Sequence, residues 1–262
     1  MKHVPSPYYL YEQTVQSPQW QVEYLPQFHE WLIGKKPRLM REDFCGTAQI
    51  SCEWVKLNPK NRAVGLDLDS DVLDYAKTIN VAGLSPARQK RIELLKQDVL
   101  KPTLQKFDFI GAYNFSFFIF HERAELLKYA KAVYASLKSK GTFFLETAGG
   151  EGFLESSREG KITKIPKVGK VEKVWEQHQY DPIQCVNDYS IHFKLPNGKW
   201  LNDAFTYHWR IWGMREVRDI LKEAGFRKTV VLWEHRDNKD EWVPAEEAAS
   251  VHYWLAYIVG VK

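Results

Sequence analysis

From residue 37 onward the sequence alternates between short apolar runs and segments with helical periodicity. Consecutive parallel strands need a long crossover, usually a helix, so this alternation predicts an α/β doubly wound fold with a mostly parallel sheet. Strands are expected at Arg38–Asp43, Arg62–Asp67, Ile92–Gln97, Phe107–Tyr113, Thr142–Glu146, Thr229–Trp233 and Val251–Val261. Helices are expected at about 47–57, 70–80, 122–138 and 215–224. The last two strands are expected to pair antiparallel, which completes a seven-stranded sheet.

Two segments differ from this pattern. Residues 1–36 are aromatic and carry apolar side chains at spacings of three and four, which predicts a helical lead-in. Residues 147–212 begin as a loop rich in glycine and lysine, and a Pro196-Asn197-Gly198 turn later joins two strand-like runs. Strands in this segment are expected at Lys170–Tyr180, Ile183–Leu195 and Lys199–Trp212. The chain is therefore divided into 1–36, an α/β core at 37–146, an antiparallel β-rich insertion at 147–212, and a helix with a strand pair at 213–262.

The charge and cysteine content exclude several classes of protein. Lysine and arginine number 37 against 33 acidic residues, and apart from a lysine-rich segment at 161–173 the excess is spread along the chain. Nucleic-acid-binding domains usually carry a more localised basic patch. Three cysteines suit a reducing compartment, and no stretch approaches the roughly 18 apolar residues of a membrane helix. We expect a cytoplasmic monomer or homodimer without a membrane partner or a metal site, and nucleic acid is not the expected partner.

The most informative segment is a strand, a tight turn and a helix at Leu39–Ala48. A turn of small residues lets a ligand approach the backbone and the helix N-terminus. Asp67 ends the next strand 21 residues after Gly46, where an acid can bind both hydroxyls of a ribose. These features predict an adenosine-containing cofactor. A dinucleotide site uses three glycines to seat its pyrophosphate, whereas this turn has one, which favours a cofactor without phosphate.

These residues resemble the class I S-adenosylmethionine (SAM)-dependent methyltransferases. The segment Glu42-Asp43-Phe44-Cys45-Gly46-Thr47-Ala48 is similar to the family's acidic-x-Gly-x-Gly-x-Gly motif, with Phe44 and Ala48 at positions where glycine is usual. Asp67 resembles the family's ribose-binding acid, and Gln97-Asp98-Val99 its adenine-binding segment. The resemblance covers about 38–146 and 215–262. It implies a Rossmann-like methyltransferase fold, SAM as cofactor and S-adenosylhomocysteine (SAH) as product.

The resemblance also implies which residues contact the cofactor. Arg41 is the candidate cation for the methionyl carboxylate, Leu68 would cover one face of the adenine, and Asn114 would lie near the methionine end. The N-terminal segment would fold over the site as a lid and contribute Tyr11 and Gln16. The full set of predicted cofactor contacts is Tyr11, Gln16, Arg41, Glu42, Phe44, Cys45, Gly46, Thr47, Ala48, Asp67, Leu68, Gln97, Asp98, Val99 and Asn114.

Three residues are candidates for catalysis. His121 could act as a general base because its ordinary pKa lies near working pH, although the same sequence also fits a helix start. In the strand around His208, alternation places Thr206, His208 and Arg210 on one face and Tyr207 with Trp209 on the other. We take His121, His208 and Tyr207 as the catalytic candidates.

The expected activity is methyl transfer to a nitrogen or oxygen atom of a small-molecule acceptor, which the β-rich insertion selects. Three alternatives remain open. One is a tRNA or protein methyltransferase that docks through the lysine-rich segment 161–173. Another is a cofactor-binding module without turnover, and the third is a nicotinamide oxidoreductase.

Overall fold

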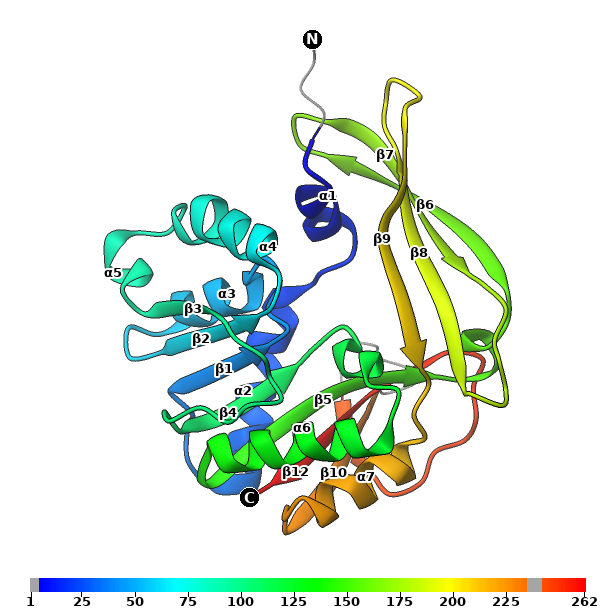
Figure 1. Ribbon diagram of the computed structural model, residues 1–262. Coiled ribbons are helices and arrows are strands. Elements are labelled where there is room, and N and C mark those ends of the chain that lie inside the picture. Colours follow the sequence, from blue (N-terminus) through cyan, green and yellow to red (C-terminus); the bar gives the residue numbers. More distant parts are fainter. Residues whose placement is uncertain (1–4, 235–241) are drawn as a thin grey trace.

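The main sheet has eight strands in the order β11-β10-β12-β5-β4-β1-β2-β3 (Figure 1). The computed structural model describes residues 5–234 and 242–262. The parallel strands are β1 (Leu39–Asp43), β2 (Arg62–Asp67), β3 (Ile92–Lys96), β4 (Phe107–Ala112) and β5 (Leu137–Gly149). The antiparallel strands are β10 (Lys228–Glu234), β11 (Trp242–Ala245) and β12 (Trp254–Val261). The predicted mostly parallel α/β sheet is confirmed, and the short β11 adds an eighth strand at one edge.

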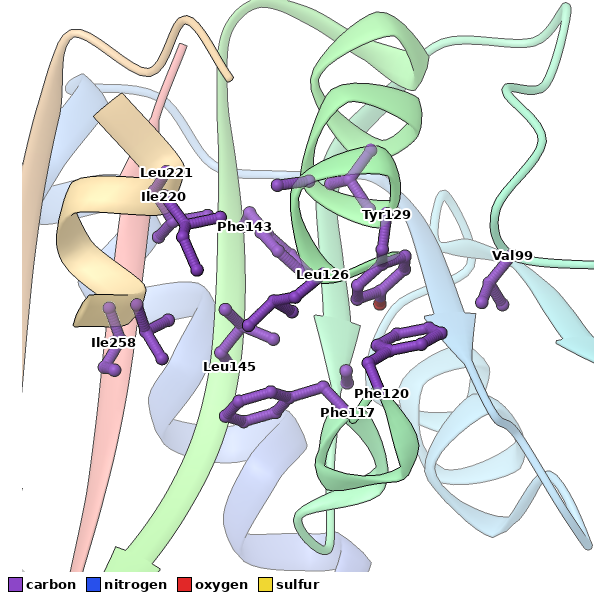
Figure 2. Close-up of a cluster of buried hydrophobic side chains, with 14 of the residues drawn as sticks. Val99, Phe117, Phe120, Leu126, Tyr129, Phe143, Leu145, Ile220, Leu221 and Ile258 are labelled. Carbon is purple, nitrogen blue, oxygen red and sulfur yellow. The ribbon is translucent and has the colours of Figure 1, made fainter. Parts of the chain in front are cut away.

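Helices pack on both faces of this sheet. On one face, α2 (Pro18–Ile33) and α3 (Gln49–Leu57) share an apolar core with the sheet. On the other face, α6 (Arg123–Ser136) and α7 (Met214–Glu223) pack over β5 and β12 (Figure 2). Phe143 belongs to the α6 core and its neighbour Phe144 to the α2 core, as the alternation of a strand requires. Short helices complete the chain at α4 (Ser70–Tyr75), η1 (Ala76–Val81), α5 (Pro86–Gln89), η2 (Ser116–Ile119) and η3 (Glu151–Phe153).

A second, antiparallel sheet stands apart from the first and carries the N-terminal helix α1 (Pro7–Thr14) against it (Figure 1). Leu10 of α1 is fully buried among apolar residues of this sheet. The strands are β6 (Ser157–Ile165), β7 (Gly169–Gln177), β8 (Val186–Lys194) and β9 (Trp200–Arg210). The antiparallel insertion was predicted with three strands, and the prediction of a loop before them was wrong. β6 is an edge strand that is mostly exposed and charged, so it lacks the apolar alternation that marks a strand.

Several element boundaries also differ from the predictions. The helix predicted to reach 138 ends at Ser136, and β5 begins at Leu137 with no intervening loop. The helix predicted at 70–80 is an α-helical turn followed by η1, a π-helix, whose wider turn changes the direction of side chains in its second half. No helix among the residues described is long and apolar enough to cross a membrane.

Candidate functional site

The turn after β1 keeps a left-handed backbone at each of the three positions where the resembled motif has glycine. The φ angles are 55° at Phe44, 50° at Gly46 and 57° at Ala48. Left-handed conformations cost a residue other than glycine about 1–2 kcal/mol, and here packing holds them. The ring of Phe44 lies 5.7 Å from that of Tyr129, and Ala48 is fully buried. The two replacements therefore preserve the path of the turn.

Gly46 lies in the middle of this turn and faces open space, because a Cβ atom there would meet nothing within 4 Å. Its N–H donates to Oδ2 of Asp67 at 2.8 Å, and the N–H of Asp69 donates to Oδ1 at 3.0 Å. Asp67 thus ties the end of β2 to the turn after β1. A carboxylate oxygen can accept further hydrogen bonds, so the half-buried Asp67 retains capacity for a ligand's hydroxyl groups.

The adenine-binding segment predicted from sequence lies beside Asp67, since the N–H of Gln97 donates to the carbonyl of Asp67 at 3.0 Å. Asp98 accepts the N–H of Leu100 at 2.9 Å, and Val99 is buried in the α6 core. These residues come together because β1, β2 and β3 are parallel neighbours whose carboxyl ends share one edge of the sheet.

A cavity of about 260 Å³ lies against the turn and extends beneath the second sheet. Its walls come from α1 and the segment after it, the turn, α4, the loop after β4, and β9. The residues that line it are Tyr8, Tyr11, Gln16, Glu42, Phe44, Cys45, Gly46, Thr47, Val72, Tyr113, Asn114, Ser116, Ile119, Phe205, Tyr207 and Trp209. The cavity therefore brings together eight of the predicted cofactor residues and one catalytic candidate, Tyr207. Asp67, Leu68, Gln97, Asp98 and Val99 lie outside it, at the ends of β2 and β3.

Two polar atoms of the cavity wall have unmet hydrogen-bonding capacity. Oε1 of Gln16 and Oγ1 of Thr47 are buried, and neither has a hydrogen-bond partner among the described residues. A buried polar atom without a partner is costly, so both atoms suit a polar ligand group. Such a group fits the amino-acid end of SAM.

Glu42 adds a carboxyl group to the same end of the cavity. Its Oε2 accepts the backbone N–H of Ser51 at 2.9 Å and the Ser51 hydroxyl. Burial raises the pKa of Glu42 to about 8, although the hydrogen bonds from Ser51 lower it. The side chain is therefore mostly neutral at pH 7.

Arg41 does not reach this cavity, and its predicted role as partner of a methionyl carboxylate is not supported by its position. Alternation along β1 turns Arg41 to the α6 face, away from Glu42. Its guanidinium is fully buried and donates to both oxygens of Asp43, at 2.7 and 2.8 Å. Asp43 also accepts the Tyr129 hydroxyl at 2.8 Å. Arg41 is therefore committed to an internal ion pair.

His121 and His208 are also outside the cavity. Nδ1 of His208 lies 2.6 Å from Oδ1 of Asp188, and both side chains are more than half exposed. Nε2 of His121 lies 2.9 Å from the His208 carbonyl. The predicted alternation in β9 is correct, but the face that carries His208 is the outer one. The inner face carries Tyr207 and Trp209 into the cavity.

Glu146, which the sequence analysis did not single out, holds the loop after β4. Asn114 and Phe115 both have left-handed backbones, with φ angles of 50° and 57°. The N–H of Asn114 donates to the buried carboxyl of Glu146 at 2.7 Å. Burial raises the pKa of Glu146 to about 7, and hydrogen bonds from Asn114 and Tyr257 lower it. Glu146 is the last residue of the predicted strand Thr142–Glu146. That position at the strand end is the one sequence signal that could have marked it as a site residue.

Comparison with known proteins finds likeness in structure and not in sequence. No family model and no curated protein matches the sequence. DesVI from Streptomyces venezuelae superposes with a TM-score of 0.73 at 15% identity, over 96% of this chain and 94% of DesVI. CalS10 from Micromonospora echinaspora, an amino pentose methyltransferase solved with SAM bound, gives 0.72 at 14% identity, over 100% and 99%.

A third solved structure has the same architecture. KedS8, a sugar N-methyltransferase from Streptoalloteichus sp ATCC 53650, gives a TM-score of 0.69 at 15% identity, over 97% of this chain and 91% of KedS8. The likeness in each case includes the second sheet, because nearly the whole of both chains is covered. The chain therefore has the fold of the SAM-dependent methyltransferases.

Proposed function

We propose that this protein transfers the methyl group of SAM to a nitrogen atom of a small molecule. The observation that carries the proposal is the cavity, because it joins the turn after β1 to aromatic side chains of the second sheet. The solved structures of the same fold support nitrogen as the acceptor atom, since CalS10 is an amino pentose methyltransferase and KedS8 a sugar N-methyltransferase.

The residues that would hold SAM lie on both sides of the turn. Asp67 would accept hydrogen bonds from the ribose hydroxyls, while Asp98 and the N–H of Val99 would bind adenine. The unpaired oxygens of Gln16 and Thr47 would accept from the methionyl ammonium group. SAM, when bound, supplies a methyl group on a sulfonium that is already activated. The chain's own contribution is to hold the acceptor in line with that group and to exclude water.

The titratable groups of the cavity favour an amine over an alcohol. Burial raises the pKa of Tyr11 to about 12 and the pKa of Tyr207 well above its ordinary value. Burial raises the pKa of Glu42 to about 8, so its carboxyl group is mostly protonated at neutral pH, and neither His121 nor His208 lines the wall. An alcohol must lose its proton to attack, whereas a neutral amine attacks through its lone pair. A cavity without a free base among its described lining residues therefore suits an amine.

We also propose a division of labour along the chain. Residues 1–36 would act as a lid, 37–146 as the cofactor-binding core and 147–212 as the acceptor-side insertion, with 213–262 completing the core. Support for the lid comes from Tyr8, Tyr11 and Gln16 in the cavity wall. The three cysteines are free thiols, which supports a reducing cytoplasm as the compartment.

The test uses matched pairs of small molecules that differ only in carrying an amino or a hydroxyl group at one carbon. Purified protein is incubated with SAM and each compound, and SAH release and product mass are measured. We expect methylation of amines only. Methylation of the hydroxyl compounds would show that the acceptor is oxygen. Binding of SAH without transfer to any acceptor would favour a non-catalytic module, and absence of SAH binding would contradict the proposal.

A further inference from the structure

A single side-chain amide connects the turn of the cofactor site to the N-terminal helix. Nδ2 of Asn80 donates one hydrogen bond to the carbonyl of Thr47 at 2.8 Å and another to Oε1 of Glu12 at 2.6 Å. Both hydrogens of the amide are therefore used, one on each side. Asn80 lies in η1, and π-helical turns of this kind occur frequently at functional sites.

The Glu12 end of this connection is built into the interface between α1 and the core. Glu12 is 7% exposed, so its carboxyl group is nearly withdrawn from water. Besides Asn80, the hydroxyl of Tyr75 lies 3.4 Å from its Oε2. The ring of Tyr8, one turn earlier, lies 5.2 Å from that of Tyr75. Since a buried carboxyl group is costly without donors, the Asn80 amide is the principal polar tie that holds α1 against η1.

The position of α1 matters to both halves of the cavity. Tyr8, in the first turn of α1, lines the cavity together with Gly46, whose N–H donates to Asp67. Tyr11, on the same helix, lines the cavity with Tyr207 of the second sheet, and its ring lies 4.9 Å from that of Phe205 in β9. Docking of α1 therefore completes the wall on the cofactor side and on the acceptor side together.

We propose that Asn80 is a positioning residue that couples the cofactor turn to the docking of α1. Thr47 lines the cavity, and it carries both the carbonyl that Asn80 holds and a buried hydroxyl without a hydrogen-bond partner among the described residues. A cofactor bound against Thr47 fixes the turn, the fixed turn holds the Asn80 amide, and the amide holds Glu12. Cofactor binding and docking of α1 thus favour each other. The inference rests on the proposed function, because it takes SAM or SAH as the ligand of the turn.

The experiment measures amide hydrogen exchange in residues 7–14 with and without SAH, and SAH affinity by calorimetry. Asn80→Ala removes both hydrogen bonds. Gln89→Ala is the matched control, because it too removes a side-chain amide that donates two hydrogen bonds. The Gln89 amide donates to the backbone carbonyls of Ala82 and Leu84 and has no hydrogen bond to α1. A second variant combines Glu12→Gln with Asn80→Asp. The amide at position 12 can then donate to the carboxyl group at position 80, but position 80 no longer has a donor for the carbonyl of Thr47.

In the wild-type protein we expect SAH to slow exchange in residues 7–14 by about tenfold or more, the effect of one hydrogen bond to a charged group. Asn80→Ala should exchange fast with or without SAH. By thermodynamic linkage it should bind SAH more weakly, by up to the same factor. The reversed pair lacks a donor to Thr47, so its exchange rate should be the same with and without SAH. Gln89→Ala should match the wild type.

Two results would overturn the coupling. One is slow, SAH-responsive exchange in Asn80→Ala, and the other is SAH binding to the wild type without any change in residues 7–14. A different result would contradict the proposed function: calorimetry would detect no SAH binding to the wild-type protein. The coupling would then be contradicted as well, because it takes SAM or SAH as its ligand.

Discussion

Replacing Arg41 by methionine distinguishes a residue that binds cofactor from one that holds the sheet and α6 together. The guanidinium is fully buried and forms two hydrogen bonds to Asp43, at 2.7 and 2.8 Å. Methionine fills similar space but leaves the Asp43 carboxylate with Tyr129 as its remaining side-chain donor. Removing one partner of a buried ion pair costs about 3–5 kcal/mol.

That cost translates into a large thermal shift. In a chain of this size, each kcal/mol lowers Tm by about 2–4 °C, so Arg41→Met should lower Tm by roughly 6–20 °C. The assay is thermal unfolding followed by circular dichroism, with SAH affinity measured by calorimetry at a temperature where the variant is folded. SAH affinity should be unchanged, because Arg41 lies on the opposite side of β1 from the cavity.

Two further variants make this prediction specific. Arg38→Met is the matched control, because the part-buried Arg38 side chain donates one hydrogen bond at 3.0 Å to the neutral Asn61, worth about 1 kcal/mol. Combining Arg41→Met with Asp43→Asn removes both charges and should recover part of the lost stability. The reasoning is refuted if Arg41→Met unfolds like the control while its SAH affinity collapses, since Arg41 would then bind the cofactor.

Three further predictions concern the cavity itself. Asp67→Asn should weaken SAH binding by about 10–100-fold, because the charged acceptor of the ribose hydroxyls is lost; calorimetry would show an unchanged affinity if Asp67 merely ties the turn to β2. Burial raises the pKa of Glu42 to about 8 from an ordinary 4.5, so its contribution to stability is fully present below about pH 4.5 and is lost as pH rises toward 8. Glu42→Gln should flatten that decline in urea unfolding at about pH 5, 7 and 9, and an equally steep decline in the variant would contradict the assignment. Tyr207→Phe removes a hydroxyl group from the acceptor-side wall, and the loss of one hydrogen bond to the acceptor should raise its KM by about 2–12-fold with SAH affinity unchanged; steady-state kinetics with an amine that the protein methylates would detect it.

The α/β architecture and the cofactor turn could be predicted because both depend on local signals. Alternating apolar runs and helical segments specify parallel strands, and parallel strands bring the turn containing Gly46 to the same edge as Asp67. Phe44 and Ala48 lacked the expected glycine signal, yet the turn has the left-handed conformations of the motif. Strand β6 was missed because an exposed edge strand carries little apolar periodicity.

The sequence by itself determined which side chains of a strand share a face, because successive side chains alternate between the two faces. It placed His208 and Tyr207 on opposite faces of their strand, and this is correct, whereas Arg41 and Glu42 were both predicted to contact the cofactor although they lie on opposite faces of β1. Which face borders the cavity depends on what packs against the strand: α3 or α6 beside β1, and the inner or outer side of the second sheet for β9. Those neighbours come from distant parts of the chain, as does the contact between Glu12 and Asn80. Only the tertiary structure could decide them, because local periodicity carries no information about long-range partners.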